Sequence, residues 1–144
     1  MVALRQVAAL PLRRAKNGDL EILLVTSRGT GRWIIPKGWP SKRLHDYRAA
    51  AREARQEAGV KGKIIPKAIG SYRYAKPELG ESCDIDVSVF LLTVLKQRKR
   101  WPEMHQRQRV WFDVLDAAKK IKEPELSSLI GRLLELNDRE APAV

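Results

Sequence analysis

The chain has 144 residues, the usual size of one domain, and can bury an apolar core without disulfides or structural metal. Its composition, 44% hydrophobic and 31% charged, argues against disorder, and its most apolar stretch, Ile85 to Leu95, is far shorter than the roughly 20 residues of a membrane-spanning helix. The chain has 28 Lys and Arg against 17 Asp and Glu, a formal net charge of +11. This charge favours nucleic acid, a polyphosphorylated metabolite or an anionic membrane surface as partner.

The first predicted elements are the two strands of a β-hairpin. Gln6 to Leu12 and Leu20 to Ser27 are apolar and rich in β-forming residues, and the Asn17-Gly18 pair between them is a strong turn signal. Further along the chain, the pattern predicts strands at Ile64 to Tyr74, Asp84 to Leu95 and Val110 to Asp113. We therefore expect a sheet of at least five strands.

Two helices are predicted to cover this sheet. The first runs from about Asp46 to Ala58 and is stopped by Gly59, the residue favoured at a helix C-terminus. Its expected core face is the stripe of Tyr47, Ala51, Ala54 and Ala58. The second follows Pro124 and repeats apolar residues at three and four positions, namely Leu126, Leu129, Ile130, Leu133 and Leu134. The expected architecture is an α/β class fold with helices on both sides of the sheet.

The single cysteine bears on the compartment. Cys83 has no partner for an intrachain disulfide, so we expect a reducing, cytoplasmic location. The N-terminal run lacks the charged front and the cleavage site of a signal peptide. We expect one domain, residues 1–137, followed by a short tail, residues 138–144, with no membrane association, and the sequence predicts no particular oligomeric state.

The segment from Trp33 to Val60 carries the most informative pattern. A loop that reads Trp-Ile-Ile-Pro-Lys-Gly-Trp-Pro precedes the predicted helix, which contains Arg-Glu-Ala-Arg-Gln-Glu-Ala-Gly-Val. This arrangement resembles the Nudix box, a glycine loop followed by a helix with acidic residues at fixed spacing. The matching residues are Gly38, Arg52, Glu53, Ala54, Glu57, Gly59 and Val60. The resemblance implies the Nudix fold, an α/β/α sandwich around a mixed sheet.

Two positions depart from the Nudix box. Leu44 stands where the loop glutamate is expected, and Gln56 stands where the first glutamate of the helix pair is expected. Leu44 can neither bind a cation nor accept a proton, and Gln56 offers only a neutral carbonyl oxygen. His45 is interpreted as a loop residue that could replace the lost base. These departures favour a site with reduced cation affinity or rate.

The spacing of the remaining acids makes chemical sense without the family. Glu53 and Glu57 are four residues apart on one helix, so their carboxylates lie together. Mg²⁺ usually takes one or two protein carboxylates and completes its coordination with water and substrate phosphate. The simpler alternative is that Glu57 forms exposed ion pairs with its arginine neighbours, each of little energetic value. The glycine loop that precedes the helix favours the metal site.

By resemblance, Glu53 and Glu57 would hold Mg²⁺ or Mn²⁺, one of them acting as base, and the backbone around Gly38 would complete the site. Arg52 would orient Glu53 or the loop carbonyls and belongs with the catalytic set. Glu103, from a later segment, is the first candidate for an additional metal ligand. The cation would neutralise phosphate charge and activate water for attack.

Within the superfamily, the loop is most similar to diphosphoinositol polyphosphate phosphohydrolases and dinucleoside polyphosphate hydrolases, and the later Arg107, Arg109, Trp111 and Phe112 support this similarity. The cations expected around a polyphosphorylated ligand are Arg28, Arg32, Lys37 and Arg109. Trp33 and Trp39 could stack on a base, although Trp33 is better explained by packing against the sheet.

These observations lead to a hypothesis and a rival. The chain is predicted to be a Mg²⁺-dependent hydrolase of a diphosphate linkage in a polyphosphorylated small molecule. The rival is a degenerate Nudix domain that binds a phosphorylated ligand, or RNA, without turnover. Leu44 and Gln56 favour the rival, whereas the intact glycine loop and the Glu53 and Glu57 pair favour the enzyme.

Overall fold

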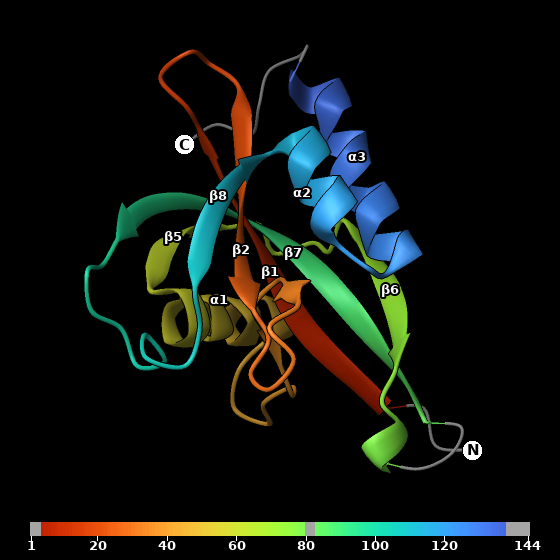
Figure 1. The fold of residues 1–144 in the computed structure, drawn as a ribbon. Coiled ribbons are helices and arrows are strands. Elements are labelled where there is room, and N and C mark those ends of the chain that lie inside the picture. The colour runs from red at the N-terminus through yellow and green to blue at the C-terminus, as the bar shows by residue number, and fades with distance from the viewer. Residues whose placement is uncertain (1–3, 80–82, 138–144) are drawn as a thin grey trace.

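The computed structural model describes residues 4–79 and 83–137, and a mixed eight-stranded sheet forms its centre. The main path of the sheet follows the order β3 (Trp33–Ile34), β2 (Leu20–Thr26), β1 (Leu4–Arg14), β7 (Asp84–Gln97) and β5 (Val60–Ile64). Three strands lie off this path: β4 (Lys37–Gly38) pairs with β1, β6 (Gly70–Ala75) with β7, and β8 (Arg109–Asp113) with β2. Only the central pair of β1 and β7 is parallel (Figure 1).

The predicted N-terminal hairpin is confirmed. β1 and β2 pair antiparallel, with Leu12 opposite Ile22. The turn between them contains Gly18 at a φ of 90°, a conformation that favours glycine because it has no Cβ. The backbone N–H of Gly18 donates to the carbonyl of Ala15 at 2.9 Å, which closes the turn.

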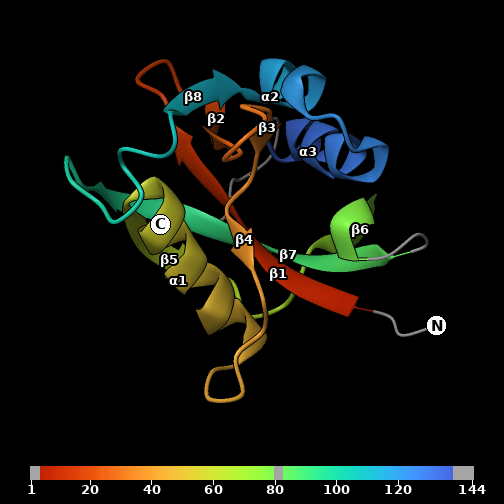
Figure 2. The same ribbon diagram turned by 60° about the horizontal axis from the view of Figure 1, so that its bottom comes forward.

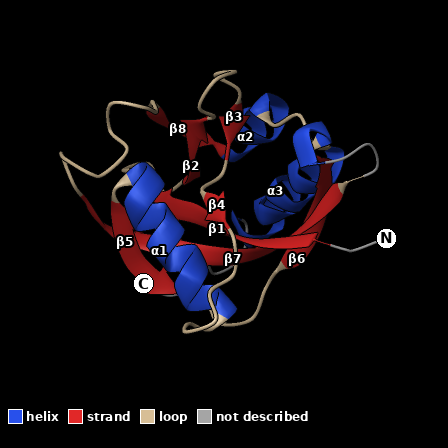
Figure 3. Ribbon diagram, turned by 90° about the horizontal axis from the view of Figure 1, so that it is seen from below, coloured by secondary structure: helices blue, strands red, loops and turns tan. Residues whose placement is uncertain are grey.

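The inner strands are apolar on both faces. In β1, Ala8 and Leu10 face one buried cluster, whereas Val7 and Ala9 face the other, because successive side chains of a strand point to opposite sides. One cluster lies under α2 (Val114–Lys120) and α3 (Pro124–Asn137), and the other lies under α1 (Asp46–Ala58). Figure 3 shows the three helices on the two sides of the sheet. The predicted α/β/α sandwich with a mixed sheet is therefore confirmed.

The first helix begins and ends where the sequence predicts. α1 spans Asp46–Ala58, and Gly59 caps it in the left-handed region at φ 68°, its N–H directed at the carbonyls of Ala54 and Arg55. The expected core stripe needs one correction, because Ala50 is fully buried and Ala51 is only half-buried. The stripe thus runs through Ala50, Ala54 and Ala58, and Glu57 is buried beside it.

The prediction of one strand from Ile64 to Tyr74 is wrong. β5 ends at Ile64 and β6 begins at Gly70, although both strands pair with β7. The intervening segment contains Pro66, which has no backbone N–H to donate to a strand partner. Ile65 and Ile69 still donate to β7 at either end of this segment, each at 2.9 Å. The chain therefore leaves the edge of β7 at Pro66 and returns to it.

The second predicted helix is confirmed as α3, whose Leu126, Leu129, Ile130 and Leu133 are buried against the sheet. Cys83 is half-buried and free. No helix in the described part of the chain is long and apolar enough to cross a membrane. The predicted tail, residues 138–144, lies outside the described residues.

Candidate active site

One cavity of about 1090 Å³ collects most of the residues singled out by the sequence. α1 forms one wall, and β6 with the short 3₁₀ helix η1 (Pro77–Leu79) forms part of the opposite wall. β4 runs between these two walls (Figure 2). The loop that joins α2 to α3 contributes the remaining side.

The glycine loop packs directly on the carboxylates of α1. A Cβ added at Gly38 would lie 2.5 Å from Cδ of Glu53, so the glycine leaves the space that this carboxylate fills. The backbone N–H of Lys37 donates to Oε1 of Glu57 at 3.2 Å. Pairing of β4 with β1, where Gly38 lies opposite Val7, fixes the loop in this position. The sheet thus positions the loop, and the loop positions both carboxylates.

Burial makes these carboxylates reluctant to ionise. Desolvation is the main cause that raises the pKa of Glu57 to about 7, and the Glu53 charge adds to it, while Arg107 and the Lys37 N–H act in the opposite direction. Desolvation also raises the pKa of Glu53, against the charge of Arg52. Two desolvated carboxylates therefore lie on the same face of α1, where an added positive charge would favour their ionised forms.

Glu103 reaches the same wall from the segment between β7 and β8. Its backbone N–H donates to the carbonyl of Gln56 at 3.3 Å, which places it beside α1. Its Oε1 accepts from Nε of Arg107 at 2.8 Å. The structure therefore brings Glu103 together with Glu53 and Glu57, as the sequence predicts, in the sense that all three line one cavity.

Arg107 is a site residue that the sequence analysis did not assign. Besides Glu103, its guanidinium contacts Oε2 of Glu57 through Nη2 at 3.7 Å and donates from Nη1 to the carbonyl of Thr26 at 3.0 Å. The side chains of Arg107 and Glu57 are each only 7% exposed. The spacing of Glu103 and Arg107, four residues apart, was a usable signal for an ion pair but gave no indication of Glu57.

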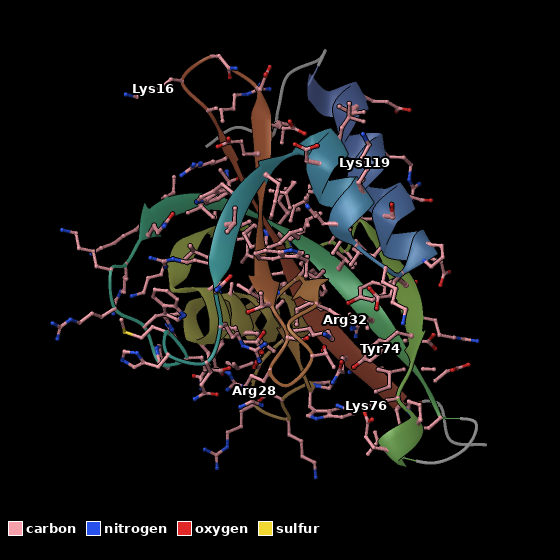
Figure 4. All side chains as sticks on the ribbon, in the orientation of Figure 1. Lys16, Arg28, Arg32, Tyr74, Lys76 and Lys119 are labelled. Carbon is pink, nitrogen blue, oxygen red and sulfur yellow. The ribbon has the colours of Figure 1, made fainter. Side chains whose placement is uncertain are left out.

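Cations line the part of the cavity that faces this acidic wall. Arg28 donates to Oε1 of Gln106 at 3.1 Å, and Arg32 donates to Oε2 of Glu123 at 3.0 Å. Desolvation lowers the pKa of Lys37 to about 8, partly offset by the charge of Glu57. Figure 4 shows Arg28 and Arg32 at the same end of the molecule as Tyr74 and Lys76, away from Lys16 and Lys119.

Tyr74 and Glu123 are further lining residues that the sequence did not indicate. The Tyr74 hydroxyl donates to Oε1 of Gln6 at 2.7 Å, and desolvation raises the pKa of this hydroxyl to about 12. The ammonium of Lys37 lies 5.2 Å from the centroid of the Tyr74 ring. Glu123 lies at the start of α3, and only the tertiary fold brings it to Arg32.

Arg109 is not brought to the cavity. Its guanidinium donates to the carbonyls of Ala58 at 2.7 Å and Arg98 at 2.5 Å, and it stacks 3.7 Å from the centroid of the Trp101 ring. Of the two predicted stacking residues, Trp39 lines the cavity and is 46% exposed. Trp33 packs edge-on against Phe112 in the core, as its apolar surroundings predicted.

The two departures from the Nudix box also lie outside the cavity lining. Leu44 packs against the apolar cluster beneath α1, and Gln56 is exposed on the helix surface. His45 is the N-terminal cap residue of α1 and stacks on Tyr47 with 5.8 Å between ring centroids. Neither Leu44 nor His45 therefore contributes a polar group to the acidic wall.

The acidic wall suits a hard divalent cation in its donor chemistry. Glu53 and Glu57 supply carboxylate oxygens from neighbouring turns, and desolvation raises the pKa of both, so a bound cation would favour their ionised forms. Among the described residues, no three His, Cys, Asp or Glu side chains converge closely enough to hold a metal ion by themselves. The donor set therefore suits a cation that binds two protein carboxylates and takes its other ligands from water and phosphate.

The fold and the cavity together define a class: an α/β/α domain in which a glycine loop and a carboxylate-bearing helix line a large cavity that also contains cationic side chains. The NUDIX domain model matches residues 3–133, and the chain belongs to the Nudix family. Arg52, Glu53 and Glu57 occupy the box positions on the cavity wall.

Curated relatives include both plant and animal Nudix proteins. Diphosphoinositol polyphosphate phosphohydrolase 3-alpha of Homo sapiens is 32% identical over 111 residues, which is 76% of this chain and 64% of that protein. Nudix hydrolase 17, mitochondrial, of Arabidopsis thaliana is 27% identical over 119 residues, 83% of this chain and 64% of that protein. The chain thus spans just under two thirds of the length of these relatives.

Among solved structures, a C. elegans Ap4A hydrolase binary complex superposes with a TM-score of 0.72 at 20% identity, covering 93% of this chain and 97% of that chain. The NUDIX domain of Shewanella oneidensis NrtR complexed with ADP ribose superposes with a TM-score of 0.67 at 14% identity, covering 93% and 90%. At these identities, the two superpositions establish the shared fold.

Proposed function

We propose that the protein hydrolyses a diphosphate linkage in a polyphosphorylated small molecule, with Mg²⁺ or Mn²⁺ as cofactor. The observation that carries the proposal is the opposition of two sets of side chains in one cavity. Glu53, Glu57 and Glu103 line the acidic wall, and Arg28, Arg32 and Lys37 face the same space. Such a cavity accepts a cation on one side and phosphate oxygens on the other.

Glu53 and Glu57 would hold the cation, and the backbone of Lys37 and Gly38 lies next to them. When bound, Mg²⁺ supplies neutralisation of phosphate charge and a lowered pKa of a coordinated water. The chain's own contribution is positional. Arg107 ties Glu103 to Glu57, and a glutamate on this wall accepts the proton of the attacking water. Arg52 lines the same cavity, and its charge favours the ionised form of Glu53 against the effect of desolvation.

The substrate-facing cations stabilise the negative charge that develops on the departing phosphate. Arg32 offers a planar fork of donors, whereas Lys37 acts as a point charge whose pKa of about 8 leaves it largely protonated at neutral pH. The cavity volume of about 1090 Å³ is ample for a ligand with several phosphates. The similarity to diphosphoinositol polyphosphate phosphohydrolases and to an Ap4A hydrolase supports these two substrate types as first candidates.

The rival function is binding of a phosphorylated ligand, or of RNA, without hydrolysis. Leu44 and Gln56 support it, because neither supplies a carboxylate to the wall, and so does the scarcity of converging metal ligands among the described residues. A cytoplasmic location remains a prediction from the single cysteine.

A substrate panel distinguishes the two functions. The purified protein is incubated with Mg²⁺ and, separately, with diphosphoinositol phosphates, dinucleoside polyphosphates, nucleoside triphosphates and nucleotide sugars, and the products released are separated by anion-exchange chromatography. If the protein is a hydrolase, we expect Mg²⁺-dependent release of product from at least one substrate class, and loss of this release in Glu57→Gln. If the wild type binds a panel member tightly but releases no product with any divalent cation, the protein is a phosphate-binding module and not a hydrolase.

A further inference from the structure

A second group of cations gathers away from the cavity, at the C-terminal end of α1. Arg55 comes from α1, Lys61 from β5, and Lys96 and Arg98 from the end of β7 and the segment after it. None of these four, which we call the α1-end basic surface, lines the cavity. Lys61 and Lys96 lie directly opposite each other in the β5–β7 register. Like charges at opposite positions destabilise a strand pair, so this arrangement costs stability.

The basic surface is not neutralised by ion pairs within the described part of the chain. None of its four members forms an ion pair with a residue in the ranges 4–79 and 83–137. The mutual repulsion is visible at Lys61, whose pKa is lowered chiefly by the charge of Arg98, with desolvation and the other two cations adding to it. The exposed Lys99 and Arg100 continue the positive run along the chain.

The backbone under this surface is held rigidly. The N–H of Arg98 donates to the carbonyl of Gly59 at 2.9 Å, and the Arg98 carbonyl accepts from the guanidinium of Arg109. Arg109 in turn stacks on Trp101, whose indole N–H donates to the carbonyl of Glu57 at 3.0 Å. Cations on a fixed backbone lose less conformational freedom when they bind than cations on a loose loop.

We propose that the α1-end basic surface binds the phosphate backbone of single-stranded nucleic acid. Closely spaced, unpaired cations match a chain of phosphates, and such binding needs no base-reading motif. An anionic membrane is less suitable, because Leu95 is the only strongly exposed large apolar side chain on β5 and β7, whereas interfacial membrane binding requires a broad apolar face. The proposal is independent of hydrolysis, because the surface shares no residue with the cavity wall.

The test compares two triple variants that remove equal charge. The surface variant carries Lys61→Gln, Lys96→Gln and Arg98→Gln. The matched control carries Lys16→Gln, Lys119→Gln and Arg132→Gln, at exposed positions on the β1–β2 turn, α2 and α3; Lys16 and Lys119 are labelled in Figure 4. Fluorescence anisotropy with a labelled single-stranded RNA oligonucleotide is recorded over a series of salt concentrations.

The surface variant is expected to bind about tenfold or more weakly, with the slope of log K against log salt reduced by about 2, because each lost phosphate contact contributes about 0.7. The control is expected to change affinity by less than about threefold, through net charge alone. Thermal unfolding of the surface variant should occur at or above the wild-type temperature, since repulsion is relieved. The single Lys96→Gln variant, expected to show a smaller loss of binding, is measured as well in case the triple variant folds poorly.

Three outcomes would overturn the proposal. Equal losses in the two triple variants would show that only net charge matters. Retention of RNA binding by the surface variant, together with its loss in the cavity variant Arg32→Gln, would place the RNA in the cavity instead. Tighter binding to phosphatidylserine vesicles than to RNA at the same salt would identify the surface as a membrane contact.

Discussion

The carboxylate of Glu53 fills the volume in which the Cβ of any larger residue at position 38 would lie, so only Gly38 fits beside it. Gly38 has no unusual backbone conformation, since its φ is not positive. The requirement for glycine is therefore one of close approach between a loop and a helix side chain. It explains in physical terms why this position of the box is coupled to the glutamate fifteen residues later.

Gly38→Ala is expected to move the Glu53 carboxylate without unfolding the protein, because the atoms that must yield are the end of a flexible side chain. Activity on the best panel substrate should fall by about 100-fold, the effect typical of a misplacement of about 1 Å at a reacting centre. Gly131→Ala is the control: a Cβ there meets open space in α3, so activity should be unchanged and stability slightly higher. Full activity in Gly38→Ala would contradict the role given to Glu53.

Glu57→Gln should make the metal-free protein more stable at alkaline pH. The folded-state pKa of Glu57 is raised from 4.5 to about 7, so the wild type gains stability from this group below about pH 4.5 and loses it as the pH rises through about 7. The variant has no such loss. Denaturant unfolding in chelator should favour it by on the order of 1 to 3 kcal/mol at pH 8, with the advantage disappearing near pH 4. The opposite pH trend would show that Glu57 is stabilised as an anion.

Arg107→Met should destabilise the fold strongly at neutral pH, because it removes the 2.8 Å ion pair with the largely buried Glu103 side chain and the charge that favours ionisation of Glu57. Breaking a buried ion pair from one side costs about 3 to 5 kcal/mol. Arg5→Met removes the exposed pair with Asp46 and should cost at most about 1 kcal/mol. Similar unfolding midpoints for the two variants would mean that Glu57 and Glu103 do not depend on Arg107.

Restoring the missing box glutamates should give unequal results. Gln56→Glu is expected to strengthen Mg²⁺ binding and raise hydrolysis, since it adds a negative charge beside the acidic wall from an exposed position. Glu53→Gln should have the opposite effect. Leu44→Glu should add little activity and should lower stability by about 1 to 3 kcal/mol, because Leu44 packs against the core. Kinetics and unfolding of the three single variants and the Leu44→Glu, Gln56→Glu double variant check this. If the wild type and the double variant are both inactive, the protein is better explained as a domain that binds a phosphorylated ligand without hydrolysis.

Ligand charge should govern affinity for the cavity. With Arg28, Arg32 and Lys37 facing the ligand, the more phosphorylated of two related molecules should bind more tightly, and rising salt should weaken binding as exposed charges are screened beyond about 8 Å. Calorimetry with a nucleoside mono- and triphosphate measures both effects. Arg28→Gln, at the exposed rim, should narrow the difference between the two ligands. Equal affinities without a salt effect would contradict the assignment of this wall.

Local pattern was sufficient for several elements. The α1 boundaries follow from the Gly59 cap and the helical spacing of alanines, and the hairpin follows from Asn17-Gly18 between two apolar runs. The pattern failed at Pro66, because a β-forming run on either side of a proline reads as one strand. It also chose Ala51 over Ala50, since both lie within one residue of the ideal stripe and only packing distinguishes them.

Some residues of the site could likewise be predicted from local sequence, and others could not. Glu53, Glu57 and Gly38 share a local motif, so their convergence is predictable from spacing. Arg107 and Arg109 are two residues apart and chemically identical, and the sequence assigned Arg109 to the ligand. Arg107 lies in the segment before β8 and reaches the acidic wall, whereas Arg109 begins β8 and reaches the C-terminal end of α1. Glu123 was missed because its position beside Arg32 depends entirely on how α3 packs.

The parallel pairing of β1 with β7 has a kinetic consequence. It joins Leu4 to Ile85 and continues for nine consecutive positions, so the centre of the sheet closes between segments far apart in the chain. Contacts of high sequence separation are entropically slow to form, whereas the β1–β2 hairpin is local. The hairpin is therefore expected to appear early in refolding. Pairing of β1 with β7 is expected to follow it and to limit the rate at which the complete sheet forms.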